Sequence, residues 1–144
     1  MDAEVAKLLG DGDPPSVELV HADGNAPVLL VCDHASRRVP RGLGTLGLDG
    51  PTLARHIGWD IGAAVVARRV AALLDAPAIL GGYSRLVIDC NRNLDDPTSI
   101  PAVSDGVPVP GNRELSTAAR AARVAAIFRP FHGEIETALD GFAA

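Results

Sequence analysis

The stretch Pro27-Val28-Leu29-Leu30-Val31-Cys32 decides the fold class, since it is a continuous apolar run bounded by Asn25 and Asp33. An apolar run of this length, without polar alternation, is typical of a strand that is buried on both faces. Such strands occur in sheets that helices cover on each side, as in α/β proteins. The sequence therefore predicts a central strand at residues 27–32, and His34 follows its end.

Two long helices are predicted on the C-terminal side of this strand. Apolar residues recur at spacings of three and four over residues 52–74, after Pro51 at the first helical turn. A second helix is expected over residues 114–139. Pro130 lies inside that second helix and is expected to kink or divide it, because proline removes one backbone hydrogen bond.

Shorter apolar runs predict the remaining strands at residues 76–80 and 86–90, with a weak strand at residues 17–20. Segments rich in glycine and proline predict loops at residues 37–50 and 95–112. The resulting order of strand, helix, strand, strand and helix predicts a layered α/β fold. In folds of this kind the ligands gather at the ends of the strands.

Length and composition fit one compact α/β domain over residues 1–144, with residues 1–16 as a peripheral segment. Hydrophobic residues make up 47% of the chain, which is enough to form a core. The net charge of −5, without a basic cluster, argues against nucleic-acid binding. Charges interrupt every apolar stretch well before the roughly 20 residues of a membrane span, and the first residues lack a leader pattern. We therefore expect a cytoplasmic protein, with Cys32 and Cys90 reduced.

The segment Tyr83-Ser84-Arg85-Leu86-Val87-Ile88-Asp89-Cys90-Asn91-Arg92 surrounds an apolar core with two arginines and an asparagine. A guanidinium pairs with a carboxylate through two parallel hydrogen bonds, so two arginines around one short strand predict a site for an anionic substrate. In the alternative interpretation these polar residues are structural partners of nearby aspartates, which are Asp89, Asp95 and Asp96. That interpretation explains each residue singly but not their clustering.

His34 and Asp60 are candidates for a metal site. An imidazole at the end of a buried strand, with Asp33 or a carbonyl to orient it, fits a zinc ligand, and a histidine that merely caps the strand is the alternative. Asp60 lies four residues after His56 and falls between apolar positions of the predicted helix, which places it toward the buried side. A carboxylate there needs a metal or an arginine as its partner, unless the two residues form a solvated pair outside the helix.

Four blocks of the sequence together closely resemble the N-formylglutamate amidohydrolase family, in the family's order and over most of residues 27–140. The blocks are Val31-Cys32-Asp33-His34-Ala35-Ser36 with Val39-Pro40, His56 to Ala63, Tyr83 to Arg92, and Ser104-Asp105-Gly106 with Pro110-Gly111-Asn112. The third block also resembles the asparagine–arginine pair of zinc carboxypeptidases and aspartoacylases, which engages the substrate carboxylate in those families. The resemblance implies a zinc-exopeptidase-like fold, with three α/β/α layers and a mixed sheet.

The resemblance further implies hydrolysis of the formamide of N-formyl-L-glutamate to formate and glutamate, with zinc as the cofactor. Zinc would lower the pKa of a bound water toward neutrality and polarise the formyl oxygen. By the same resemblance His34 is a zinc ligand and Asp60 a second one, while Arg85, Asn91 and Arg92 would hold the substrate or stabilise the oxyanion. The implied partner is a small N-acyl amino acid with carboxylates, rather than a nucleic acid or a membrane.

Members of the family are usually longer, and the resemblance implies a C-terminal half that brings another histidine ligand and a glutamate general base. The general base is therefore expected beyond Ala144, with the fold truncated at its C-terminus. Zinc normally takes three protein ligands and a water, so the third ligand would come from elsewhere, or from His56 or His132. Two hypotheses follow, an amidohydrolase or a non-catalytic module that binds an acidic small molecule or a partner chain. Apolar surface left uncovered would also favour self-association.

Overall fold

A three-stranded mixed sheet organises the chain, for which the computed structural model describes residues 7–143. Strand β3 (Ala78–Gly81) lies in the centre, antiparallel to β1 (Val17–Val20) and parallel to β2 (Leu30–Cys32). The strand order is therefore β1-β3-β2, and all four residues of β3 are buried. The strand predicted at residues 17–20 is confirmed, and the strand predicted at residues 76–80 is found at residues 78–81.

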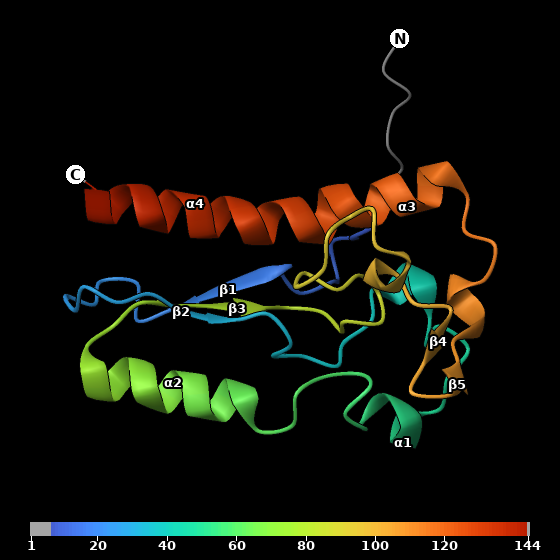
Figure 1. The fold of residues 1–144 in the computed structure, drawn as a ribbon, viewed down its shortest axis with the longest axis horizontal. Helices are drawn as coiled ribbons and strands as arrows, with labels where there is room; N and C mark the ends of the chain where they lie inside the picture. The colour runs from blue at the N-terminus through green and yellow to red at the C-terminus, as the bar shows by residue number, and fades with distance from the viewer. Residues whose placement is uncertain (1–6, 144) are drawn as a thin grey trace, which may run out of the picture.

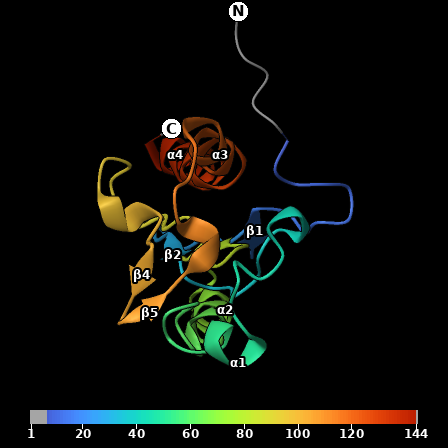
Figure 2. The ribbon, with the colours of Figure 1, turned by 90° about the vertical axis from the view of Figure 1, so that its right-hand side faces the viewer.

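Helices cover both faces of the sheet (Figure 1). Helix α2 (Ala63–Leu74) packs against β2 and β3 on one face. On the other face lies the C-terminal helical segment, which consists of α3 (Thr117–Arg123), the turn η4 (Val124–Phe128) and α4 (Arg129–Ala143). Within this segment α4 contacts β1 and β3, and Figure 2 shows the strands between the two helical layers. The predicted α/β fold with a mixed sheet is confirmed.

Strand β2 is shorter than predicted and lies at an edge of the sheet. The prediction of a central strand buried on both faces at residues 27–32 is therefore wrong, because β3 occupies the central position. Val31 is 47% exposed and Val28 is 44% exposed, since no further strand or helix within residues 7–143 covers this edge. An apolar run indicates a strand, but the order of pairing decides which strand is central.

The helix predicted over residues 52–74 is divided into α1 (Gly50–Leu53) and α2, with an irregular segment at residues 54–62 between them. Two glycines account for the interruption. A Cβ atom on Gly58 would lie 2.1 Å from the carbonyl oxygen of Leu53, so only glycine fits where the chain turns back. Gly62 has a φ of 84°, in the left-handed region that favours glycine, and α2 begins directly after it.

Residues 86–90 are buried but do not form the strand that the sequence predicts. The carbonyl oxygen of Leu86 accepts a hydrogen bond of 2.8 Å from Nδ2 of Asn112, and the carbonyl oxygen of Val87 accepts one of 2.9 Å from Nη1 of Arg123. Buried carbonyl groups need such partners, which a neighbouring strand would otherwise supply. The strand prediction is wrong because the side chains of Asn112 and Arg123 supply the hydrogen bonds that the backbone of a neighbouring strand would otherwise supply.

Pro130 leaves the second long helix continuous in direction (Figure 1). The helix begins after Ser116, whose hydroxyl oxygen accepts a hydrogen bond of 3.1 Å from the amide of Ala119. Directly before Pro130, the five residues of η4 form a π-helical turn. A wider turn accommodates a proline, because the ring lacks the N–H donor and crowds the preceding turn of an α-helix. The expected disturbance therefore takes the form of a wide turn.

The loop predicted at residues 95–112 contains a small hairpin, in which β4 (Val103–Ser104) pairs antiparallel with β5 (Val107–Pro108). Asp105 and Gly106 connect the two strands with φ values of 46° and 75°, which suit a tight hairpin turn. The hairpin lies beside the sheet in Figure 2. Three short 3₁₀ turns complete the loops: η1 (Arg41–Leu43), η2 (Pro97–Ser99) and η3 (Pro110–Asn112).

The segment predicted to be peripheral is described from residue 7 onward, and residues 1–6 lie outside the described part of the chain. Leu8 and Leu9 are partly buried and pack against the core. The hydroxyl group of Tyr83 donates a hydrogen bond of 2.5 Å to the carbonyl oxygen of Pro14. Within residues 7–143, no helix has both the length and the apolar character needed to cross a membrane.

Candidate functional site

Charged side chains meet beyond the carboxyl ends of two parallel strands. Asp33 and His34 follow β2, and Arg85 and Asp89 follow β3, so the pairing of these strands brings the four residues to one end of the sheet. Asp60 comes from the irregular segment before α2. Its backbone N–H donates a hydrogen bond of 2.9 Å to the carbonyl oxygen of His34, which holds that segment beside the end of β2. We call His34, Asp60, Arg85 and Asp89 the His34 cluster.

A buried imidazole–carboxylate pair forms the centre of the His34 cluster. Nε2 of His34 lies 2.6 Å from Oδ1 of Asp89, and the two residues are only 5% and 3% exposed. Burial acts to lower the pKa of His34, but the hydrogen bond and the charge of Asp89 outweigh it and raise this pKa. Burial acts to raise the pKa of Asp89, but the hydrogen bonds from His34 and from the Asn91 amide outweigh it and lower this pKa. Each residue therefore favours the charged form of the other.

Asp60 and Arg85 complete the cluster. Nδ1 of His34 lies 3.4 Å from Oδ2 of Asp60, and Nη1 of Arg85 lies 3.2 Å from the other carboxylate oxygen of Asp60. Nη2 of Arg85 lies 3.4 Å from Oδ2 of Asp89, so the guanidinium bridges two carboxylates. The helical placement predicted for Asp60 is wrong, because its side chain is 52% exposed on a loop. The partner arginine that the sequence suggested for it is present.

Asn91 and Arg92 line a different cavity from the His34 cluster. This cavity has a volume of about 410 Å³ and is lined by Cys90, Asn91, Arg92, Asn93, Asp96, Phe128 and His132. The two sites are connected through the backbone, since the amide of Asn91 donates a hydrogen bond of 2.9 Å to Oδ1 of Asp89. The structure thus places Arg85 with His34 and Asp60, and it places Asn91 and Arg92 next to them on the other side of Asp89.

Neither of the other two histidines considered as ligands joins the cluster. Nε2 of His56 lies 2.9 Å from Oδ2 of Asp105 on the surface. Because residues 54–62 are not helical, His56 and Asp60 share no helical face. Nε2 of His132 lies 2.9 Å from the carbonyl oxygen of Cys90, at the wall of the Arg92 cavity. Both rings are therefore paired with groups outside the His34 cluster.

The serine and cysteine side chains nearby are packed rather than activated. The buried hydroxyl of Ser84 donates a hydrogen bond of 2.6 Å to the carbonyl oxygen of Gly58 and accepts one from the amide of Leu86. Cys32 and Cys90 are both free thiols, as the sequence predicts. Burial raises the pKa of Cys90 to about 12, so its thiol remains protonated near neutral pH. Neither the Ser84 hydroxyl nor the Cys90 thiol is therefore activated as a nucleophile.

Asp89 is the one member of the cluster whose role the sequence did not reveal. The sequence suggested it only as a structural partner of the neighbouring arginines and asparagine. The structure does pair it with Arg85, and it also pairs it with His34, 55 positions earlier. A signal was present, because a carboxylate inside the apolar run of residues 86–90 must have a buried partner. Nothing in the run identifies which histidine or arginine that partner is.

The cluster matches the surroundings of a metal ion in part. A metal-binding histidine usually donates its second ring nitrogen to a carboxylate, as His34 does to Asp89, which leaves Nδ1 directed at Asp60. Oδ1 of Asp33 lies farther away, at 3.9 Å from Nδ1 of His34. Within residues 7–143, however, no group of three or more acidic, histidine or cysteine side chains is arranged to hold a metal ion. Among the described residues, a divalent cation at this position would have at most His34 and Asp60 as its ligands.

The fold and this cluster define an α/β protein with a polar site at the ends of its parallel strands, and comparison with known proteins gives its family. The family model of N-formylglutamate amidohydrolase matches residues 26–144. The chain therefore belongs to the N-formylglutamate amidohydrolase family, and the resemblance seen in the sequence blocks is confirmed.

A solved structure supports the same relationship. The crystal structure of a gene product from Agrobacterium tumefaciens is 36% identical to the chain and superposes with a TM-score of 0.91. The match covers 94% of this chain and 54% of that protein, so the chain spans about half the length of its structural relative. Comparison with curated proteins gives no match.

Proposed function

We propose that the chain contributes to the hydrolysis of the formamide of N-formyl-L-glutamate, which yields formate and glutamate. The family membership supports this reaction class. The observation that carries the proposal is the buried contact of 2.6 Å between His34 and Asp89, with the carboxylate of Asp60 on the other ring nitrogen. An imidazole held in this way is oriented as a ligand rather than as a strand cap. We also propose the zinc-exopeptidase-like character of the fold on the same grounds.

In this proposal His34 and Asp60 hold a zinc ion, and Asp89 fixes the orientation of the imidazole. When bound, zinc supplies an activated water and polarises the formyl oxygen of the substrate. Arg85 balances the charge of both carboxylates, at 3.2 Å from Asp60 and 3.4 Å from Asp89, and it stabilises negative charge that develops beside them. The substrate is a small N-acyl amino acid with carboxylates.

Arg92 is proposed to hold a substrate carboxylate together with Asn91. Both residues line the cavity of about 410 Å³, and the Arg92 side chain forms no ion pair within residues 7–143. Its guanidinium is therefore available for an anion, whereas that of Arg85 is occupied. The backbone N–H of Asn91 donates a hydrogen bond to Asp89, so a substrate held in this cavity would lie next to the His34 cluster.

The test measures zinc and formate in the same purified protein. We expect about one zinc ion per chain and release of formate from N-formyl-L-glutamate. His34→Gln should lose both the zinc and the formate release, while His56→Gln, which alters a surface imidazole paired with Asp105, should retain both. Pure protein with neither zinc nor formate release would contradict the proposal. Saturable binding of N-formylglutamate without turnover, lost in Arg92→Ala, would instead support a non-catalytic binding module.

Self-association through β2 and α2 is a further expectation. The outer edge of β2 pairs with no other strand within residues 7–143, and a groove of about 500 Å³ runs between this strand and α2. Val31, Ile61 and Val66 line this groove and are exposed, and the same two segments of the chain carry the exposed Val28, Val65 and Leu73. A second copy of the chain could pair edge to edge and cover these side chains, as unprotected strand edges and apolar patches tend to do.

Sedimentation velocity tests this association. We expect the wild-type chain to form dimers at micromolar concentration, and Val66→Asp on α2 to shift it toward the monomer because a charge would enter the apolar contact. Leu139→Asp is the matched control, since Leu139 is similarly exposed on α4, on the other face of the sheet. A monodisperse wild-type monomer, or an equal effect of both variants, would count against this surface.

A further inference from the structure

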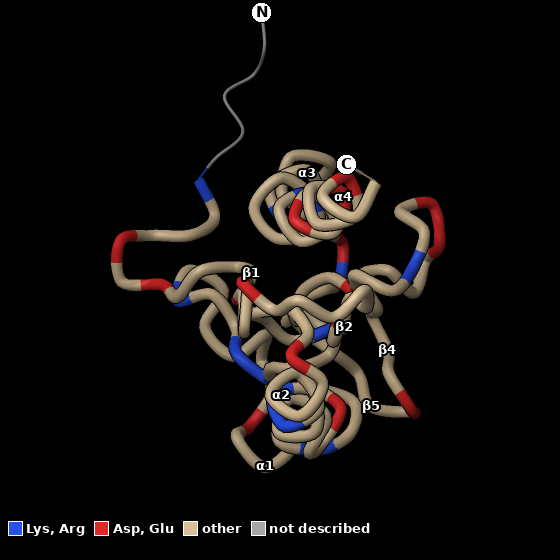
Figure 3. Tube along the Cα trace, turned by 90° about the vertical axis from the view of Figure 1, so that its left-hand side faces the viewer, with Lys and Arg blue, Asp and Glu red and all other residues tan. Residues whose placement is uncertain are grey.

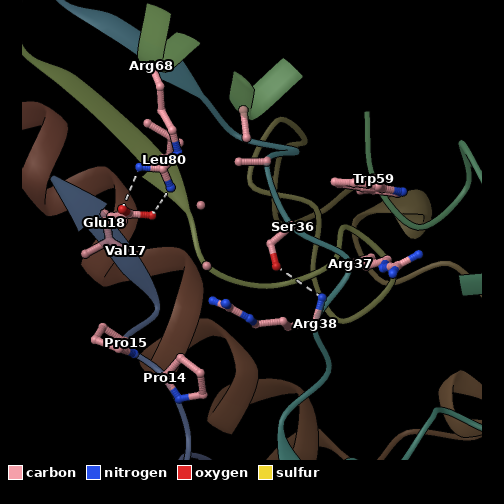
Figure 4. Close-up of a pocket in the computed structure, with 14 residues that line it drawn as sticks. Pro14, Pro15, Val17, Glu18, Ser36, Arg37, Arg38, Trp59, Arg68 and Leu80 are labelled. Atoms are coloured by element: carbon pink, nitrogen blue, oxygen red, sulfur yellow. Dashed lines mark hydrogen bonds and ion pairs between the residues drawn. The ribbon is translucent and has the colours of Figure 1, made fainter. Parts of the chain in front are cut away.

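A further cleft, distinct from the His34 cluster, lies between α2, β1 and the chain that follows β2 (Figure 4). Its volume is about 570 Å³, within the usual range of roughly 300–1,000 Å³ for small-molecule sites. No member of the His34 cluster lines it. Its walls nevertheless come from the same two loops, because Ser36 follows His34 closely and Trp59 directly precedes Asp60. We call it the Arg38 cleft.

The Arg38 cleft carries an excess of positive charge in a chain whose net charge is −5. Three arginines and one carboxylate line it. Glu18 neutralises Arg68 through two hydrogen bonds of 2.8 and 2.6 Å, which leaves Arg37 and Arg38. Figure 3 shows basic segments on α2 and beside β1, on the same side of the sheet. The cleft therefore has two positive charges that its own acidic group does not balance.

Arg37 and Arg38 point in different directions in Figure 4. The guanidinium of Arg37 lies 5.4 Å from the ring centre of Trp59, in a cation–π contact. Arg38 instead extends across the cleft toward Pro14 and Val17. Within residues 7–143 the guanidinium of Arg38 forms no ion pair and no hydrogen bond. Arg38 is thus the cation of the cleft that remains available to a ligand.

The backbone of Arg38 is fixed on both sides, so its side chain starts from a defined position. Its amide donates a hydrogen bond of 3.1 Å to the hydroxyl oxygen of Ser36, and its carbonyl oxygen accepts one of 2.7 Å from the amide of Ser84. The charge of Arg38 also acts within the cleft. The hydrogen bond from Arg68 is the main cause that lowers the pKa of Glu18, and Arg38 adds to this effect.

We propose that the Arg38 cleft binds the carboxylate of a small organic acid. A planar guanidinium matches a carboxylate through two parallel hydrogen bonds, and the neighbouring apolar walls of Pro14, Pro15 and Val17 suit the hydrocarbon part of such an acid. This site goes beyond the proposed hydrolysis and does not require it, because it contains no residue assigned to zinc or to the substrate in the Arg92 cavity. Its ligand would contact the loops that carry His34 and Asp60.

Trp59 provides a direct measurement, because it is the only tryptophan of the chain and lines the cleft. Its indole N–H is held by a hydrogen bond of 3.0 Å to the carbonyl oxygen of Ala54. The experiment titrates the purified protein with glutarate and follows tryptophan fluorescence at constant ionic strength. We expect a saturable change with a dissociation constant in the millimolar range. Inorganic phosphate, which lacks a hydrocarbon part, should bind more weakly.

Three variants decide the result. Arg38→Gln should weaken glutarate binding by about tenfold, which is the loss of one good charged contact. Arg38→Lys should retain part of the affinity, which also shows that the site still folds. Arg113→Gln removes an exposed arginine outside the cleft and should change nothing. The proposal is overturned if glutarate gives no saturable change, if Arg38→Gln binds as well as the wild type, or if phosphate binds as tightly as glutarate.

This readout is independent of catalysis. A chain that releases no formate but shows the Arg38-dependent fluorescence change would refute the proposed hydrolysis and support the cleft. Arg92→Gln should leave the fluorescence titration unchanged, because Arg92 lines the other cavity. If Arg92→Gln weakens glutarate binding as much as Arg38→Gln does, the ligand lies in the Arg92 cavity and the cleft proposal is wrong.

Discussion

Asp89→Ala is expected to lower the free energy of unfolding by about 4 kcal/mol, the loss found when one partner of a buried ion pair is removed. Asp89 accepts hydrogen bonds from the His34 ring at 2.6 Å and from the Asn91 amide at 2.9 Å, and it faces Arg85 at 3.4 Å. The variant would leave a buried imidazole and a guanidinium without their shared carboxylate. Urea unfolding followed by circular dichroism measures the change.

Asp33→Ala is the control for this prediction. Asp33 lies 3.9 Å from Nδ1 of the same imidazole, but its side chain is more exposed than that of Asp89. We expect it to cost no more than about 1 kcal/mol, because the Asp33 carboxylate is partly solvated and lies farther from the ring. Equal losses in the two variants would show that the buried contact of 2.6 Å contributes no more to stability than the longer contact with Asp33.

Arg123→Met is expected to lower the free energy of unfolding by about 3 kcal/mol, because it leaves several buried acceptors unpaired. Arg123 is 1% exposed and has no acidic partner within residues 7–143. Its guanidinium donates to the carbonyl oxygen of Val87 at 2.9 Å, to Oδ1 of Asn112 at 2.6 Å and to the carbonyl oxygen of Gly111 at 3.3 Å. Methionine fills much of the volume, so the loss reports mainly on these hydrogen bonds.

Arg129→Met provides the comparison on the same helical segment, since Arg129 is exposed and should change stability by no more than about 0.5 kcal/mol. Hydrogen exchange adds a local readout. The Arg123 guanidinium binds the carbonyl oxygen of Val87 and so stabilises the buried turn that contains Val87 and Asp89. Arg123→Met should therefore speed hydrogen exchange of the Val87 and Asp89 amides more than that of the β3 amides. Unchanged stability in Arg123→Met would mean that water satisfies the freed carbonyl groups.

The sequence was most informative where local pattern and local structure coincide. The strands at residues 17–20 and 78–81 and the long C-terminal helix follow from apolar runs and helical spacing. The blocks shared with the family also indicated His34, Asp60 and Arg85, which the structure brings together. These predictions depend on residues that are close in sequence or that recur as recognisable blocks.

Predictions failed where distant residues decide the local conformation. Residues 86–90 look like a strand, but Asn112 and Arg123 satisfy their carbonyl groups and allow a buried turn. The periodicity of residues 52–74 continues through Gly58, although the backbone there turns back toward Leu53. In the same way, no local signal pairs His34 with Asp89, because that contact depends on the parallel pairing of β2 and β3.

The hydrogen bond from the Asp60 amide to the His34 carbonyl has a consequence for any ligand that both side chains bind. It joins two loops that would otherwise move independently, so the entropy lost in bringing them together is spent during folding rather than on binding. The affinity for such a ligand would then depend on how well ordered the segment at residues 54–62 is. A substitution at Gly58, whose missing Cβ leaves room for the carbonyl oxygen of Leu53, would loosen this segment and so weaken binding of the ligand.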